Sequence, residues 1–141
     1  MADITTVNPV TGEDIKEYNY MSNDEVNNIV EASHEAFLEW RKTSHEERAK
    51  VIKSIGETLA KYKEELSKLM TEERGKLYNQ SLSEVDLCIG ICDYTAEKGV
   101  TALADDVRDI ENMKKGIVTY QPIGVISVSY THLTLPTNRE V

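Results

Sequence analysis

Three times in this chain a serine is followed three residues later by a glutamate, and each time a stripe of apolar residues comes next. The serine and glutamate positions are Ser22 with Glu25, Ser44 with Glu47, and Ser81 with Glu84. This is the capping-box pattern, in which each residue's side chain accepts a hydrogen bond from the backbone N–H of the other. Because the apolar residues that follow are mostly three and four positions apart, the sequence predicts three amphipathic helices.

The predicted helices have distinct ends. The first runs from about Asn23 to Arg41, the second follows Ser44 and stops near Gly75, and the third follows Ser81. Glycine is the usual residue just after a helix, because it adopts the left-handed conformation without steric cost. The apolar stripes are Val26, Ile29, Val30, Ser33, Phe37 and Trp40; Ile52, Ile55, Leu59, Tyr62, Leu66 and Leu69; and Val85, Cys88, Ile89, Cys92, Ala96, Val100 and Leu103.

Strand-like segments lie at both ends of this helical region. ITTVNPVTGEDIKEYNY predicts two short strands around a turn that contains Pro9 and Gly12. The acidic ADDVRDIENMKKG indicates a surface connection, and GIVTYQPIGVI after it is typical of strands, with Pro122 at a turn or a sheet edge. Neither strand region has an evident partner sheet, so the chain is predicted to be mostly α, with the beginning of an α/β assembly.

The charge of the chain excludes some partners. It has 25 acidic and 16 basic residues among 141, for a net charge of −9. A nucleic-acid backbone and an anionic membrane both attract cationic surfaces, so neither is an expected partner. The sequence shows no secretory signal and no long apolar run, and its two cysteines are expected to stay reduced. We therefore expect a cytoplasmic location.

Residue patterns alone reveal no catalytic centre. Arg74-Gly75-Lys76 lacks the first glycine and the hydroxyl residue of a phosphate-binding loop, so a helix stop explains it better. Cys88 and Cys92 are expected to pack in the core, because no further metal ligands lie near them in sequence. The histidines are scattered and show no partner that would make one of them a general base; they are His34, His45 and His132.

Several phrases together resemble the beginning of the aldehyde dehydrogenase superfamily. They are VNPVTGE, the A…AF..W pattern from Ala32 to Trp40, HEERAKVIKSIGETLAKYKEEL, TEERGK, CDYTAEKG and YQPIGVI. They occur in the family's order and at compatible spacing from about residue 4 to residue 126. Among the family's members, the chain looks most similar to the succinate-semialdehyde type.

The resemblance implies an α/β fold and an NAD- or NADP-dependent oxidation of an aldehyde to a carboxylic acid through a thiohemiacetal. The family's nucleophilic cysteine, general-base glutamate and cofactor-binding residues lie downstream of the region that this chain matches. Neither Cys88 nor Cys92 corresponds to the nucleophile. The chain is therefore expected to hold no catalytic or cofactor-binding residue and to be inactive alone.

The resemblance also implies two sites and an assembly. Backbone carbonyls of Thr6, Val7 and Glu73 correspond to ligands of a monovalent cation, K+ or Na+. Leu87 corresponds to a position that lines the substrate tunnel. Family members form homodimers or homotetramers, and here the strand region from Ile117 to Tyr120 would contribute to that assembly.

The resemblance ends at Ser127 or Val128. The following VSYTHLTLPT resembles the translation of a transposase-type sequencing adapter. Residues 1–127 are therefore expected to be an incomplete aldehyde dehydrogenase domain, and residues 128–141 a non-native tail.

The alternative is an acidic helical module that binds another protein through its helix faces. Such a module should fold cooperatively by itself. A family fragment should instead expose apolar side chains and aggregate or stay partly molten. The side chains in question are Ile117, Val118, Ile123, Val125 and Ile126.

Overall fold

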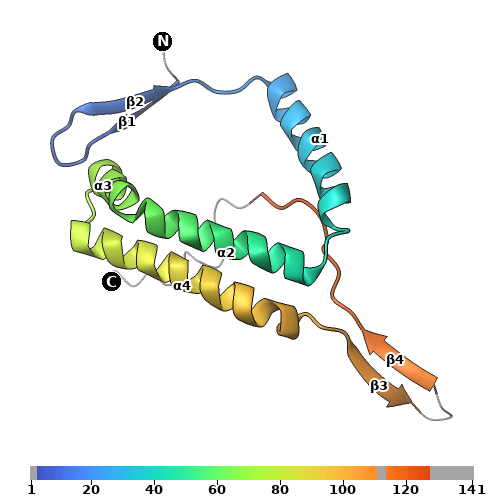
Figure 1. Cartoon of the computed structure of the whole chain (residues 1–141). Coiled ribbons are helices and arrows are strands. Elements are labelled where there is room, and N and C mark those ends of the chain that lie inside the picture. The colour runs from blue at the N-terminus through green and yellow to red at the C-terminus, as the bar shows by residue number, and fades with distance from the viewer. Residues whose placement is uncertain (1–2, 111–113, 128–141) are drawn as a thin grey trace, which may run out of the picture.

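The computed structural model describes residues 3–110 and 114–127 as a mostly helical chain with two small strand pairs (Figure 1). The elements are β1 (Ile4–Val7), β2 (Asp14–Tyr18), α1 (Asn23–Trp40), α2 (His45–Lys61), α3 (Lys63–Arg74), α4 (Tyr78–Ala102), β3 (Asp106–Ile110) and β4 (Lys114–Val118). The predicted fold class, mostly α with small strand regions at both ends, is confirmed, although the described residues form four helices where three were expected. The predicted non-native tail, residues 128–141, lies outside the described residues.

The first two capping boxes form as predicted. The backbone N–H of Glu25 donates to the Ser22 hydroxyl at 3.3 Å, and the Glu25 carboxylate accepts from the Ser22 N–H at 2.8 Å. Ser44 and Glu47 repeat the arrangement at 3.1 and 2.8 Å. The Ser22 and Ser44 backbone N–H groups, and then the serine hydroxyls, lower the pKa of the two glutamates. These boxes fix where α1 and α2 begin.

The third predicted capping box is wrong. Helix α4 begins at Tyr78 and its N-cap is Leu77, so Ser81 lies inside the first turn. The Ser81 side chain is completely buried, and its hydroxyl donates to the Leu77 carbonyl at 3.4 Å. The carboxylate of Glu84 pairs with Lys76 instead of a backbone N–H. Ser81 thus lies in the contact of α4 with α3 and does not cap α4.

The single second helix predicted from Ser44 to Gly75 is also wrong, because the chain bends at Tyr62. Tyr62 has φ −102° and ψ 14°, and α3 leaves in a new direction from the end of α2 (Figure 1). Helical hydrogen bonding continues on both sides, with Tyr62 donating to Thr58 at 3.1 Å and accepting from Leu66 at 2.9 Å. The apolar stripe runs through the bend unbroken, so the sequence contained no signal for it.

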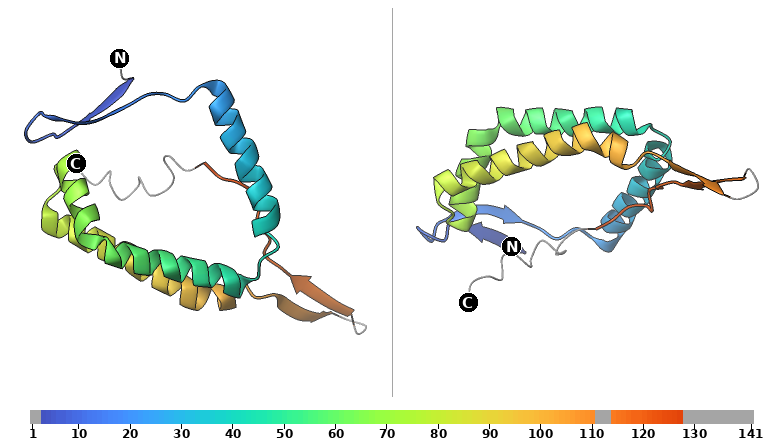
Figure 2. Two further views of the ribbon diagram at one scale, coloured as in Figure 1. Left: turned by 45° about the horizontal axis from the view of Figure 1, so that its top comes forward. Right: turned by 90° about the horizontal axis from the view of Figure 1, so that it is seen from below.

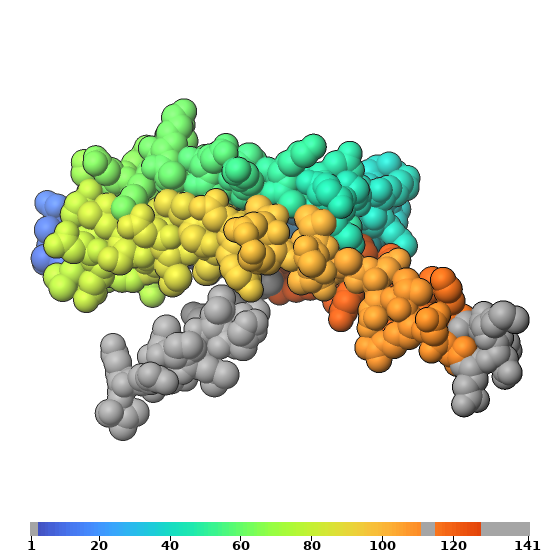
Figure 3. Space-filling model, turned by 60° about the horizontal axis from the view of Figure 1, so that its bottom comes forward, coloured from blue at the N-terminus to red at the C-terminus, as the bar shows by residue number. Residues whose placement is uncertain are grey.

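Helix α4 packs against α2 along its length and against α3 near its start (Figure 3). Gly56 of α2 is buried, and a Cβ placed on it would lie 3.0 Å from the Cβ of Cys92. Cys92 thus lies on the packed side of α4, as predicted. Cys88 is exposed, so its predicted place in the core is wrong.

The contact between α3 and α4 is made by small hydroxyl residues. Ser67 and Ser81 are both completely buried. Ser67 donates to the Lys63 carbonyl at 2.7 Å, and Thr71 donates to the Ser67 carbonyl at 3.0 Å. The hydroxyls of Thr71 and Ser81 lie 3.5 Å apart across the interface. Because these hydroxyls are paired within the protein, their burial carries little desolvation cost.

Both strand pairs are antiparallel hairpins. In the first, which was predicted, Ile4 lies opposite Tyr18, with an irregularity between Thr6 and Val7. In the second, Asp106 lies opposite Val118. The predicted acidic surface connection is therefore wrong over Asp106–Ile110, which forms β3. The charged residues of this segment are not typical of a strand, and it forms one by pairing with β4.

Much of the apolar surface has no covering element. α1 stands apart from the packed helices and has no buried residue (Figure 2). The β3–β4 hairpin projects beyond the helices, and residues 119–127 form no strand. Within the described residues, Val85 is the one buried hydrophobic side chain. The side chains expected to be exposed in a family fragment are exposed; they are Ile117, Val118, Ile123, Val125 and Ile126.

Two glycines provide a matched test of the α2–α4 contact. Gly90 is in the middle of α4 with open space around its Cα, so Gly90→Ala should raise the free energy of unfolding by about 1 kcal/mol through helix propensity. Gly56→Ala should lower it, because the new methyl group meets the Cys92 Cβ and overpacking costs about 1–3 kcal/mol. Urea unfolding followed by circular dichroism measures both. Equal stabilisation by the two substitutions would show that α2 and α4 are not in close contact.

Candidate functional site

The turn between β1 and β2 is held by Asn8. Its side-chain oxygen accepts from the N–H groups of Val10 at 2.9 Å and Thr11 at 3.3 Å. Its backbone carbonyl accepts from Gly12 at 2.8 Å, and Gly12 has φ +75°, which suits glycine. Local hydrogen bonds therefore fix the shape of the turn that directly follows Thr6 and Val7.

The same turn contacts the end of α3. Gly75 closes that helix in the left-handed conformation, with φ +66°, and its N–H donates to the Thr71 carbonyl at 3.0 Å. A Cβ placed on Gly75 would lie 3.1 Å from Cγ of Pro9. The hairpin turn and the helix end, about 65 positions apart in sequence, are thus in direct contact.

The residues predicted to hold a monovalent cation lie on either side of this contact. Thr6 and Val7 are at the end of β1, and Glu73 is in the last turn of α3. The last four carbonyls of a helix have no intrahelical donor, and the C-terminal end of a helix attracts cations. The Thr6 hydroxyl donates to the Lys16 carbonyl at 3.2 Å, so this side chain is tied to β2. The predicted ligands are the backbone carbonyls of Thr6, Val7 and Glu73.

Leu87, the predicted tunnel residue, lies on an exposed stripe of α4. The side chain of Leu87 is 63% exposed, and those of Ile91 and Tyr94 are 55% and 68% exposed. Their spacing of four and three places them on one face of the helix. Ile91 and Tyr94 were not among the predicted site residues, because they lie outside the apolar stripe that was predicted to pack in the core.

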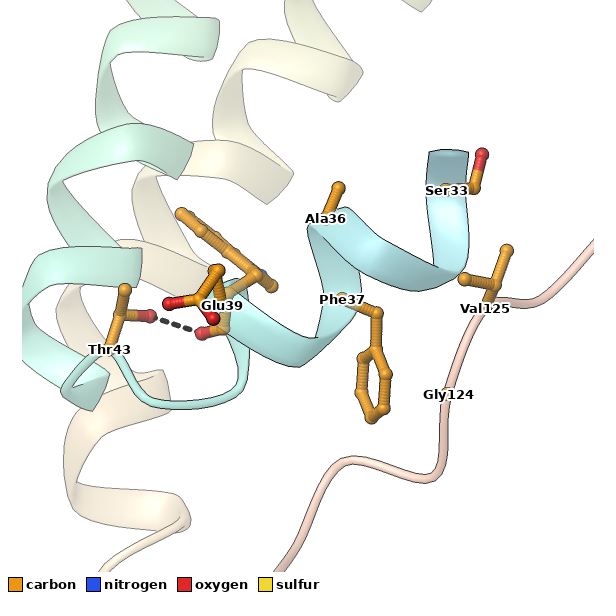
Figure 4. A pocket seen from close by; sticks show the side chains of 8 residues that line it. Ser33, Ala36, Phe37, Glu39, Thr43, Gly124 and Val125 are labelled. Atoms are coloured by element: carbon orange, nitrogen blue, oxygen red, sulfur yellow. Dashed lines mark hydrogen bonds between the residues drawn. The ribbon is translucent and has the colours of Figure 1, made fainter. Parts of the chain in front are cut away.

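A separate pocket of about 640 Å³ lies between α1 and the segment around Gly124 (Figure 4). Phe37 projects from α1 beside the chain at Gly124, and Val125 lies across from the helix. The lining residues are Ser33, Ala36, Phe37, Glu39, Trp40, Thr43, Gly124 and Val125. Three of them belong to the apolar stripe predicted for the first helix. The pocket is mainly apolar and contains no cysteine or histidine.

The cysteines and histidines predicted to have no catalytic role lie apart from one another in the described residues. Cys88 is exposed and Cys92 packs against Gly56. His34 is near the Phe37 ring, and His45 is at the start of α2. Residues 3–110 and 114–127 contain no cluster of three or more histidine, cysteine, aspartate or glutamate side chains able to hold a metal ion.

No helix in the part of the chain that the structure describes has both the length and the apolar character needed to cross a bilayer.

Comparison with known proteins supplies the context for these sites. The model of the aldehyde dehydrogenase family matches residues 2–130. The Escherichia coli succinate semialdehyde dehydrogenase Sad is 31% identical over 86% of this chain and 26% of its own length. Malonate-semialdehyde dehydrogenase 2 of Geobacillus kaustophilus is 34% identical over 84% of this chain and 25% of its own length. The chain thus spans about a quarter of the curated relatives it matches.

Solved structures agree with this match. The succinic semialdehyde dehydrogenase of Streptococcus pyogenes, solved with NADP+, is 29% identical with a TM-score of 0.70, over 76% of this chain and 24% of that one. Gox0499 gives a TM-score of 0.81 over 87% of this chain and 27% of its own, at 18% identity. The latter likeness shows the fold alone.

Gly75 and Gly12 provide a matched test of the contact between the hairpin turn and α3. Both have positive φ, so an alanine at either position costs roughly 1–2 kcal/mol in backbone energy. Only at Gly75 does the new methyl group also meet Pro9. Gly75→Ala should therefore lower the free energy of unfolding more than Gly12→Ala, as measured in urea. Equal losses would contradict the contact.

Proposed function

The chain belongs to the aldehyde dehydrogenase family, and on this basis we propose that it forms the N-terminal part of an NAD(P)-dependent aldehyde dehydrogenase. The observation that carries the proposal is the agreement of sequence and fold over the same region, at 29% identity and a TM-score of 0.70 to one solved enzyme. The whole enzyme would oxidise an aldehyde to a carboxylic acid. The residues described here would supply scaffold and substrate-facing surface.

The substrate we propose is an aldehyde that also carries a carboxylate, of the succinate-semialdehyde type. The curated relatives from Escherichia coli and Arabidopsis thaliana are named for that substrate, at 31% and 33% identity. NAD or NADP would be the cofactor of the full-length enzyme. We propose a cytoplasmic location, while the Arabidopsis relative is named as mitochondrial.

By itself the described chain is proposed to be inactive. Oxidation of an aldehyde in this way needs an activated thiolate, a general base and a bound nicotinamide. Cys92 is packed between helices, and Cys88 is exposed on α4. Neither lines the two pockets between α1 and the segment around Gly124, which supports the assignment of catalysis to other parts of a full-length enzyme.

Three features would contribute to the whole enzyme. Carbonyls of Thr6, Val7 and Glu73 would hold K+ or Na+, supported by the contact of Pro9 with Gly75 beside them. Leu87 would line the substrate tunnel, supported by its exposure on an apolar stripe. A homodimer or homotetramer would use the region from Ile117 to Tyr120, supported by the exposed apolar side chains of Ile117, Val118 and Tyr120 at the end of β4 and just after it.

A chimera tests the proposal. Residues 1–127, joined to the rest of the Escherichia coli relative at the matching position, should reduce NAD(P)+ in the presence of succinate semialdehyde. The 141-residue chain and the remaining part of the relative, each assayed alone, should show no turnover. Cofactor reduction is followed by absorbance. A folded chimera that binds NADP+ but does not turn over would contradict the proposal.

A further inference from the structure

The connection from α3 to α4 contains a lysine whose side chain is held at α4. Lys76 directly follows Gly75, and its ammonium pairs with the carboxylate of Glu84 in the second turn of α4. The two side chains are 34% and 47% exposed, and an exposed ion pair of this kind adds little to the stability of a protein. What the pair does determine is the position of the ammonium.

The C-terminal end of α3 would otherwise attract this ammonium. The last carbonyls of a helix have no intrahelical donor, and a lysine near the helix end commonly donates to them. Among the described residues, no N–H or hydroxyl group donates to the carbonyl of Glu73. Lys76 comes three positions later, so its long side chain can fold back onto this helix end. Arg74 is less suited, because side chains within a helix tilt toward its N-terminus, away from the last carbonyls.

The same helix end faces the hairpin turn. Gly75 contacts Pro9, and Thr6 and Val7 belong to the strand that leads into that turn (Figure 1). A carbonyl without a donor, at the negative end of the helix dipole and close to a second segment of backbone, fits K+ or Na+. An ammonium at this position would exclude the ion, because it would take the same carbonyls and repel a second positive charge.

We propose that Glu84 keeps the end of α3 open to a monovalent cation by holding the ammonium of Lys76 away from it. The inference rests on the proposed cation site at the carbonyls of Thr6, Val7 and Glu73, and it adds a positioning residue to that site. Glu84 acts through Lys76 and is not itself a ligand. Without the Glu84 carboxylate, the ammonium moves to the end of α3 and competes with K+ or Na+ for the carbonyls.

A second ion pair between the same two helices provides a matched control. Lys63, at the start of α3, pairs with Asp86 of α4 at 2.6 Å. Glu84 and Asp86 are two positions apart and flank the buried Val85, so they lie on opposite sides of α4. Loss of the Asp86 carboxylate would release Lys63 at the N-terminal end of α3, where the helix presents N–H groups. It would therefore supply no competitor at the other end.

The test compares potassium with a cation too large for the site. Urea unfolding of the 141-residue chain is followed by circular dichroism in KCl and in tetramethylammonium chloride at equal concentration, which keeps the ionic strength constant. The urea midpoint should be higher in KCl for the unaltered chain and for Asp86→Asn. The difference should be lost in Glu84→Gln. It should return when Lys76→Met is added to Glu84→Gln, because no ammonium then remains to compete.

This return separates the inference from a structural role of the ion pair. If the pair only held the helices together, removal of the second partner would not restore a potassium effect that removal of the first had abolished. The inference would be overturned by a potassium effect that persists in Glu84→Gln, that is lost in Asp86→Asn, or that stays absent from the double variant. Its absence from the unaltered chain would overturn the proposed cation site as well. The proposed dehydrogenase is tested separately, by turnover of the chimera.

Discussion

The close approach of α4 to α2 and α3 is the contact on which the rest of this structure depends. It is made by residues that take little space: Gly56 beside Cys92, and the buried Ser67 and Ser81. Small side chains let helix backbones come together, and their hydroxyls are satisfied by carbonyls of their own helices. The helices therefore pack tightly without forming a large apolar core.

Because the helices pack without a large apolar core, much of the chain's apolar surface is exposed. α1, the β3–β4 hairpin and the segment after it leave many apolar side chains exposed in the described residues. Burial of apolar area is the main favourable term in folding, so such surfaces are normally covered in a stable protein. If the chain is part of a full-length enzyme, as we propose, the rest of that enzyme would cover these faces.

The sequence predicted correctly those features that interactions between neighbouring residues determine. Ser22 and Ser44 cap helices, the turn at Gly12 forms a hairpin, and Gly75 ends a helix, because each depends on neighbouring residues alone. Predictions that failed depend on contacts with another element. Asp106–Ile110 becomes a strand through β4, and Ser81 is buried by α3. The candidate cation ligands came from family resemblance, and the contact of Gly75 with the turn at Pro9 brings their two segments together.

The account holds that α2, α3 and α4 form a folded unit, whereas α1 and residues 123–127 become ordered only against the rest of a family domain. Amide hydrogen exchange of the 141-residue chain and of an active full-length chimera tests this most directly. The account predicts slow exchange in α2 and α4 in both proteins, and slow exchange in α1 and residues 123–127 in the chimera alone. Equal protection of α1 in the two proteins would contradict it.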